Sequence, residues 1–124
     1  MSEIADLLLQ HQTLRAALGH AWNPFFARFG SLRPVQLTAI PPILAGQSTL
    51  VTAPTAGGKT EALAAPICEL MARHRWPGLS VLLITPTRAL VNDLYARLEL
   101  PLGHMRIGLG RKTVTVRRNA SCCL

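Results

Sequence analysis

The sequence has few acidic residues, few aromatic residues and no long apolar run. Asp and Glu together number six, and aromatic residues make up 5% of the chain. No apolar run reaches the roughly 20 residues that a membrane-spanning helix needs. The acids Glu3 and Asp6 stand where a secretory signal would carry basic residues. These absences argue against a membrane or secreted protein and predict a cytoplasmic chain.

The three cysteines fit neither a disulfide framework nor a zinc site. Cys68 is isolated, whereas Cys122 and Cys123 are adjacent, and neither arrangement has the spacing that such sites use. Cys68 is therefore predicted to be a small buried hydrophobic residue in a reducing cytoplasm. No metal role is expected for His11 or His20, because no further ligands stand at suitable spacing.

The scarcity of acids leaves a net charge of +7. Residues 101–124 hold five basic residues and no acid. The hydrophobic fraction of 49% is typical of a globular chain. A basic surplus suits a polyanion such as nucleic acid, but a solvated basic tail would carry the same charge. Charge alone leaves both interpretations open.

The clearest chemical signal is in residues 53–60, which read Ala-Pro-Thr-Ala-Gly-Gly-Lys-Thr. A short apolar and β-branched run, Thr49–Thr52, precedes them and a helix-prone run follows. A strand, a loop ending in Gly-Lys-Thr and a helix form the layout of a phosphate-binding loop. Lys59 can reach the β- and γ-phosphates of ATP, and the Thr60 hydroxyl can ligate Mg²⁺. The residues that let backbone N–H groups surround phosphate oxygens are Thr55, Ala56, Gly57 and Gly58.

One position departs from the usual form of this loop. The general pattern begins with Gly, and here that place is Ala53. The alternative interpretation is a Gly-rich turn before an ordinary helix, with Lys59 as a solvated charge in the first turn.

Apolar spacing predicts four helices, and apolar runs predict strands. The predicted helices cover Ile4–Leu18, Pro34–Leu44, Lys59–Arg75 and a segment after Pro86 that runs to about Leu98. The predicted strands are Thr49–Thr52, Ser80–Thr85 and a short Met105–Leu109. Pro101 is expected to end the last helix. The predicted fold class is α/β, with a parallel β-α-β core and a right-handed crossover.

Two further segments suit contacts with a nucleotide and with nucleic acid. The Gln36 amide can bond to the N6/N7 edge of adenine, and Phe29 can lie against the base; a surface Gln is the alternative. Pro86, Thr87 and Arg88 follow the second predicted strand, where ligand sites of parallel sheets lie. A hydroxyl and a guanidinium suit a phosphodiester backbone. A Thr cap followed by a solvated Arg is the alternative there.

Taken in order, Phe29 to Gln36, residues 53–60 and residues 86–90 resemble the Q motif, motif I and motif Ia of superfamily 2 DEAD/DEAH-box helicases. Residues 85–94 are most similar to the large helicase-related branch. The resemblance covers roughly residues 22–112 and implies a partial RecA-like ATP-binding domain. Residues 1–21 then form an N-terminal helix, and residues 113–124 form an atypical tail that we expect to be disordered.

The resemblance also implies roles for individual residues. Phe29 and Gln36 would bind adenine, and the loop ending in Lys59 and Thr60 would hold the phosphates and Mg²⁺ of ATP. Residues 86–88 would hold a strand of DNA or RNA. Backbone contacts carry no base information, so the choice between DNA and RNA stays open.

The chain departs from the family in its acidic residues. ATP hydrolysis in such enzymes needs a second acidic motif, D-E-x-D/H, after another strand. The acids after Thr60 stand singly, and none follows a predicted strand; they are Glu61, Glu69, Asp93 and Glu99. The motif III stretch, the second lobe and its arginine finger are absent too. The residues after Thr113 no longer resemble the family, which suggests an interrupted reading frame.

Three hypotheses follow from these patterns. The chain is the amino-terminal piece of an ATP-dependent helicase, inactive alone; or a partial P-loop domain that binds nucleotide or nucleic acid without turnover; or a non-functional remnant.

Overall fold

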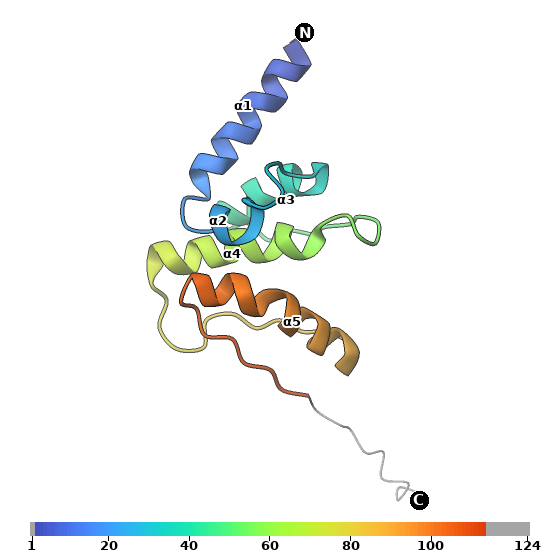
Figure 1. Cartoon of the computed structure of the whole chain (residues 1–124), viewed down its shortest axis with the longest axis vertical. Helices are drawn as coiled ribbons and strands as arrows, with labels where there is room; N and C mark the ends of the chain where they lie inside the picture. Colours follow the sequence, from blue (N-terminus) through green and yellow to red (C-terminus); the bar gives the residue numbers. More distant parts are fainter. Residues whose placement is uncertain (1, 114–124) are drawn as a thin grey trace, which may run out of the picture.

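A computed structural model describes residues 2–113, and in this range the chain consists of helices joined by loops (Figure 1). The helices are α1 (Ser2–Ala17), α2 (Trp22–Phe26), α3 (Pro34–Leu44), α4 (Lys59–His74) and α5 (Arg88–His104). The helix predictions for α1, α3 and α4 are confirmed to within two residues at each end. α2 is an additional short helix that contains Trp22, Phe25 and Phe26.

The predicted α/β fold class is wrong for residues 2–113, and so are the partial RecA-like sheet and its β-α-β crossover. The segments Thr49–Thr52, Ser80–Thr85 and Met105–Leu109 contain no strand. Leu50 is 91% exposed and Ile84 is 84% exposed. A parallel strand needs hydrogen-bonding neighbours and cover on both faces. The described part of the chain supplies neither, so these apolar runs remain extended loops.

The local sequence explains how α3 and α5 begin. Pro34 stands in the first turn of α3, where its missing N–H group costs nothing. The Thr87 side chain accepts a hydrogen bond of 3.2 Å from the backbone N–H of Leu90 and so caps α5. This is the capping role that the sequence left open for Thr87.

Pro101 does not end α5, in contrast to the prediction. The helix continues through this residue to His104, and the backbone N–H of Met105 bonds to the Pro101 carbonyl at 3.2 Å. Leu98 and Leu102, on either side of Pro101, are both buried in the core. Burial of two leucines stabilises the last turn by about as much as one interior proline costs, roughly 3 kcal/mol.

The core lies where α2 and the second half of α1 meet α3, α4 and α5. Its main side chains are Leu14, Leu18, Trp22, Phe25, Phe26, Leu37, Ile40, Ala65, Cys68, Leu98 and Leu102. Trp22 and Phe26 pack with ring centroids 5.5 Å apart. Trp22, Phe25 and Phe26 thus pack in the core, whereas Phe29 is 55% exposed. The prediction that Cys68 is buried is also confirmed.

Glu69 of α4 is buried at the junction of α1 and α2. Its carboxylate accepts hydrogen bonds from the backbone N–H groups of His20 at 2.9 Å and Ala21 at 3.0 Å. The His20 ring lies 3.1 Å and the Arg73 guanidinium 3.2 Å from the other oxygen. Burial alone would raise the pKa of Glu69, but the hydrogen bonds from His20 and Ala21 and the attraction of the His20 ring hold it below its usual value. The carboxylate therefore fixes the start of α2 against α4.

Candidate functional site

Residues 53–60 form a tight loop that leads directly into α4. The backbone N–H of Gly57 donates to the Pro54 carbonyl at 3.0 Å and closes a turn. Ala56 has φ of 64° and Gly58 has φ of 85°, both in the left-handed region. The loop therefore turns sharply before α4, and the free N–H groups of the first turn of α4 follow it.

Steric contacts show why glycine stands at two positions of the loop. A Cβ atom at Gly58 would lie 2.6 Å from Nε2 of Gln36, and one at Gly57 would lie 2.9 Å from the Pro54 carbonyl oxygen. Both distances are shorter than real Cβ contacts allow. The backbone can approach its surroundings this closely only without side chains, as a phosphate-binding loop requires.

Two cationic side chains donate to carbonyl oxygens of the loop. Nζ of Lys59 donates to the Ala53 carbonyl at 2.7 Å, and the Arg33 guanidinium donates to the Ala56 carbonyl. Among residues 2–113, neither cation forms an ion pair with an acid. Two cations with neutral partners beside a glycine-rich loop make this region attractive to an anion.

Arg33 is a site residue that the sequence analysis missed. The sequence signal that could have indicated Arg33 is its position directly before Pro34, at the start of α3. This signal does not reveal its contact, because the Arg33 side chain binds a loop that lies more than 20 residues further along the chain. Only the packing of α3 against α4 brings the two together.

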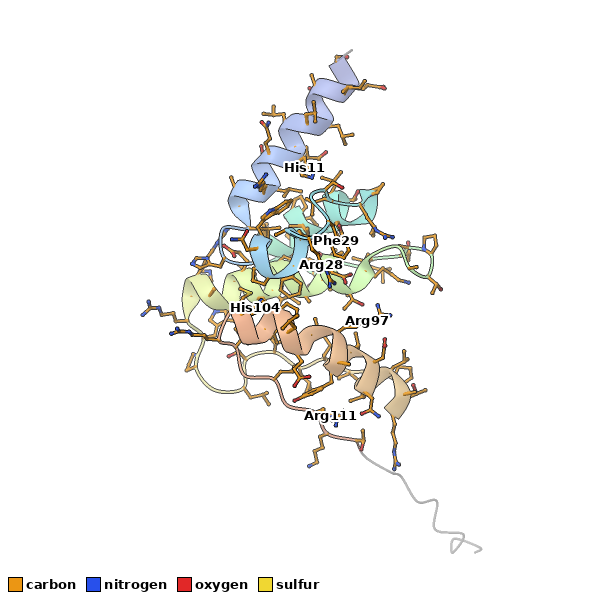
Figure 2. The ribbon with its side chains drawn as sticks, viewed as in Figure 1. His11, Arg28, Phe29, Arg97, His104 and Arg111 are labelled. Atoms are coloured by element: carbon orange, nitrogen blue, oxygen red, sulfur yellow. The ribbon has the colours of Figure 1, made fainter. Side chains whose placement is uncertain are left out.

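The two residues predicted to bind adenine have separate environments. Gln36 is buried, and its amide donates to the Gly58 carbonyl at 3.2 Å and accepts from the Arg33 backbone N–H at 2.8 Å. Phe29 is exposed and carries the Arg28 guanidinium 4.6 Å above its ring (Figure 2). In this conformation Gln36 links the start of α3 to the loop.

A cavity of about 600 Å³ borders the start of α4 at Thr60 and Glu61. Its other walls come from α2 with the residues after it and from the second half of α5. Figure 2 shows Arg28 on the side of α2, and Arg97 and His104 on α5, around this region. Arg97 pairs with Asp93 at 3.1 Å, and both side chains are exposed.

The predicted nucleic-acid residues Pro86, Thr87 and Arg88 are all exposed at the start of α5. Thr87 caps the helix, and Arg88 forms no ion pair within the described residues. α4 and α5 run in the same direction, so that their N-terminal ends lie toward the same side of the molecule (Figure 1). The structure thus places the loop at residues 53–60 and the segment at residues 86–88 on one side.

His11, His20 and Cys68 have structural surroundings. Nε2 of His11 accepts the Leu32 backbone N–H at 3.0 Å, and His20 contacts Glu69. Burial raises the pKa of the Cys68 thiol to about 11, so the thiol is protonated at neutral pH. Residues 2–113 contain no cluster of three potential metal ligands of the His, Cys, Asp and Glu type. No helix in this range is both long and apolar enough to cross a membrane.

Comparison with known proteins adds independent information. The model of the DEAD/DEAH box helicase family matches residues 33–121. Over 76 residues the chain is 38% identical to the "Probable ATP-dependent RNA helicase DDX52" of Bos taurus. This match covers 61% of this chain and 13% of that protein. It is 39% identical over 70 residues to the ATP-dependent RNA helicase HAS1 of Candida glabrata, covering 54% of this chain and 14% of the relative.

A third relative extends the match slightly. The chain is 35% identical over 85 residues to the ATP-dependent RNA helicase HCA4 of Saccharomyces cerevisiae, covering 66% of this chain and 11% of that protein. The chain therefore spans only about an eighth of the length of these relatives. No solved structure is significantly similar to it. Because the family model matches well over half of the sequence, including Arg33, the loop at residues 53–60 and the segment at residues 86–88, the chain belongs to the DEAD/DEAH box helicase family.

Proposed function

We propose that this chain binds ATP with Mg²⁺ through residues 53–60 and an RNA strand through Pro86, Thr87 and Arg88, as the nucleotide-binding part of an ATP-dependent RNA helicase. The observation that carries the proposal is the loop before α4, in which Gly57 and Gly58 have no room for a Cβ atom. The family match and the names of the relatives support ATP and RNA as the ligands.

The residues of the loop fit a triphosphate. Thr55 and Ala56 are exposed, and with Gly58 they offer backbone N–H groups at the start of a helix whose dipole favours an anion. The Gly57 N–H donates to the Pro54 carbonyl and would have to leave it to bind a phosphate oxygen. Lys59 would exchange the neutral Ala53 carbonyl for a phosphate oxygen, which needs only rotation of its side chain.

Mg²⁺ would be held by the Thr60 hydroxyl together with phosphate oxygens and water. The ion would neutralise negative charge on the phosphates. Glu69 and Asp93 are poorly suited to complete its shell, because Glu69 is buried among hydrogen-bond donors and Asp93 pairs with Arg97. Glu61 and Glu99 stand singly, without the second acid that hydrolysis in this family uses. We therefore propose nucleotide binding without appreciable hydrolysis by this chain alone.

Adenine recognition would require a rearrangement at Gln36. Its amide is buried and bonds through both ends, to the Gly58 carbonyl and to the Arg33 backbone N–H, so it must leave these partners to present an oxygen and an N–H to the base. Phe29 is already exposed and able to lie against an aromatic ring once Arg28 moves from its face. Adenine binding at this place would thus be coupled to the conformation of the loop.

For the RNA strand, the exposed Arg88 guanidinium supplies the charge. It lies in the first turn of α5, and a phosphodiester there would also meet the free N–H groups of the helix. The Thr87 oxygen accepts from Leu90, which leaves its own hydrogen free to donate to a phosphate.

Titration of the full chain with a fluorescent ATP analogue in the presence of Mg²⁺ tests the nucleotide part of this proposal. We expect Lys59→Ala to weaken binding at least about tenfold, the size of one charge-assisted contact. Lys112→Ala is the matched control, because Lys112 is the other lysine and is exposed. Failure of the folded wild-type chain to bind, or equal binding by both variants, would overturn the proposal.

A further inference from the structure

Three side chains, Asn92, Tyr95 and Arg111, form a cluster on one side of α5. The Arg111 guanidinium lies over the Tyr95 ring, 4.6 Å from its centroid, and its Nη1 donates to the Asn92 side-chain oxygen at 3.0 Å. Figure 2 shows Arg111 on the side of α5 opposite Arg97, which borders the cavity. The Tyr95–Arg111 cluster, as we call these three residues, is therefore separate from the cavity.

Two contacts hold the Arg111 side chain in place although it is exposed. Asn92 binds one end of the guanidinium, and the Tyr95 ring supports its face. Neither partner is an acid, and Arg111 forms no ion pair within residues 2–113. Arg111 thus keeps its charge and its remaining N–H donors for a ligand. A side chain that is already held in place loses less conformational entropy on binding.

A guanidinium that lies over a tyrosine ring suits a nucleobase. Bases of single strands stack on aromatic rings and on arginine guanidinium groups. Tyr95 is half-buried, so the protein itself supports its ring. The donors of Arg111 that Asn92 does not use can meet a phosphate oxygen of the same strand. A small anion or an acidic peptide would use the charge alone, so the combination of ring and charge favours nucleic acid.

The position of the cluster fits the strand proposed to bind at residues 86–88. Arg88, Asn92 and Tyr95 stand at positions i, i+4 and i+7, along one face of α5. Seven residues of helix span about 10 Å, so neighbouring nucleotides of one strand can reach both Arg88 and the cluster. The exposed Glu99 follows on the same face, and its charge would repel phosphates beyond Tyr95.

We propose that the Tyr95–Arg111 cluster stacks one base of the RNA strand whose backbone binds at Arg88. The inference rests on the proposed function, because it adds a base contact to the backbone contact at residues 86–88. The base lies against the Arg111 guanidinium, with the Tyr95 ring behind it, and Arg111 also donates to a neighbouring phosphate. Every base has a π face, so this contact binds a single strand without selecting its sequence.

The Tyr95 ring reports on the contact directly. Tyr95 is the only tyrosine of the chain, so labelling with ¹³C-tyrosine gives ring signals from this residue alone. The full chain is titrated with single-stranded hexaadenylate, and in parallel with a ribose-phosphate hexamer that lacks bases. Hexaadenylate should shift the Tyr95 ring signals saturably, and the abasic hexamer should shift them much less. An equal, saturable shift with ATP and Mg²⁺ alone would assign the cluster to a free nucleotide and overturn the proposal.

Fluorescence anisotropy with labelled hexaadenylate measures what the cluster contributes to affinity. Arg111→Lys keeps the charge but loses the flat guanidinium, and Tyr95→Leu keeps the apolar bulk but loses the ring. Each should weaken binding of hexaadenylate about tenfold, whereas Tyr95→Phe should bind as wild type does. Arg15→Lys is the matched control, because Arg15 is an exposed arginine that lies 5.2 Å from the Trp22 ring centroid on another helix.

The abasic hexamer separates a base contact from a merely structural role. Its weaker binding should be the same in wild type, Arg111→Lys and Tyr95→Leu, because all three keep the charges that meet phosphates. Equal losses for both ligands would overturn the proposal. If only Arg88→Ala weakens binding of hexaadenylate, the stacking contact is wrong and the proposed backbone contact at residues 86–88 stands. Failure of the folded wild-type chain to bind hexaadenylate would overturn both.

Discussion

At the scale of single residues, the described region depends most on polar side chains that hold backbone groups far away in the sequence. Glu69 binds the start of α2, Gln36 binds the loop before α4, and His11 binds the segment before α3. Among residues 2–113, no buried side-chain nitrogen or oxygen lacks a hydrogen-bond partner. Each of these residues joins two elements, and loss of Glu69 or His11 would leave the N–H group of a buried residue, Ala21 or Leu32, without its partner.

Glu69→Gln should destabilise the chain by about 1.5–3 kcal/mol at pH 7, because the amide cannot replace a carboxylate that accepts from four donors. The pKa of Glu69 is lowered in the folded state, so its contribution to stability is present above the unfolded-state value of about 4.3. It is lost as the pH falls through the folded-state value.

Urea unfolding midpoints at pH 7 and at pH 3.5 measure this effect. The difference in unfolding midpoint between wild type and Glu69→Gln should be smaller at pH 3.5 than at pH 7. Glu99→Gln, at an exposed glutamate, should match wild type at both values. A gap for Glu69→Gln that is the same at both pH values would show that packing, not the carboxylate charge, matters at this position.

At the scale of elements, the loop before α4 combines backbone strain with a close contact. Gly58→Ala should destabilise the chain by about 2–4 kcal/mol, because it adds a Cβ at positive φ and places it 2.6 Å from Gln36. Gly46→Ala is the control, since Gly46 also has positive φ but nothing within 4 Å. It should cost only about 1 kcal/mol.

Thermal or urea unfolding of the two variants separates these contributions. If Gly58→Ala and Gly46→Ala were equally stable, the close packing of Gln36 against the loop would not exist in solution. A specific loss of nucleotide binding in Gly58→Ala alone would link that packing to the proposed function.

The helices were predictable because their signals are local. Apolar spacing located α1 and α4, and Pro34 and Thr87 marked the starts of α3 and α5. The continuation of α5 past Pro101 was not predictable, since it depends on Leu98 and Leu102 reaching a core built by other helices. Local signals therefore predicted the positions of the helices, whereas the end of α5 depended on tertiary packing.

The strand predictions were wrong because a strand, like the end of α5, depends on contacts with other parts of the chain. An apolar run such as Ser80–Thr85 indicates a strand only where neighbouring strands pair with it. In the site, the motif correctly predicted a turn at Gly57 and Gly58 and a helix that begins at Lys59. This geometry was predictable because it depends on local sequence. The bond from Arg33 to Ala56 and the burial of Gln36 arise from tertiary contact, and no spacing in the sequence encodes them.

At the scale of the whole molecule, stability comes from packing of helices, and the two long apolar loops contribute little. Leu82→Glu should change the free energy of unfolding by less than about 0.5 kcal/mol, because Leu82 is exposed. Leu18→Ala should cost about 2–5 kcal/mol, because Leu18 is fully buried. Chemical unfolding of both variants measures the difference.

This comparison tests the helical architecture itself. In a sheet covered on both faces Leu82 would be buried, and an introduced carboxylate there would prevent folding. Loss of the folded state in Leu82→Glu would therefore contradict the fold. Lower aggregation of this variant would agree with it, since Leu50 and Ile84 make the loops apolar and exposed.

The central claim is that backbone N–H groups of the loop before α4 bind the phosphates of ATP. Backbone amide chemical shifts in a ¹⁵N-labelled full chain, followed during titration with ATP and Mg²⁺, report on these groups directly. The largest saturable changes should occur at Gly57, Gly58, Lys59 and Thr60, and Lys59→Ala should reduce them. If these amides do not shift, or shift no more than exposed amides such as Gly110, the loop does not bind ATP and the proposed function is wrong.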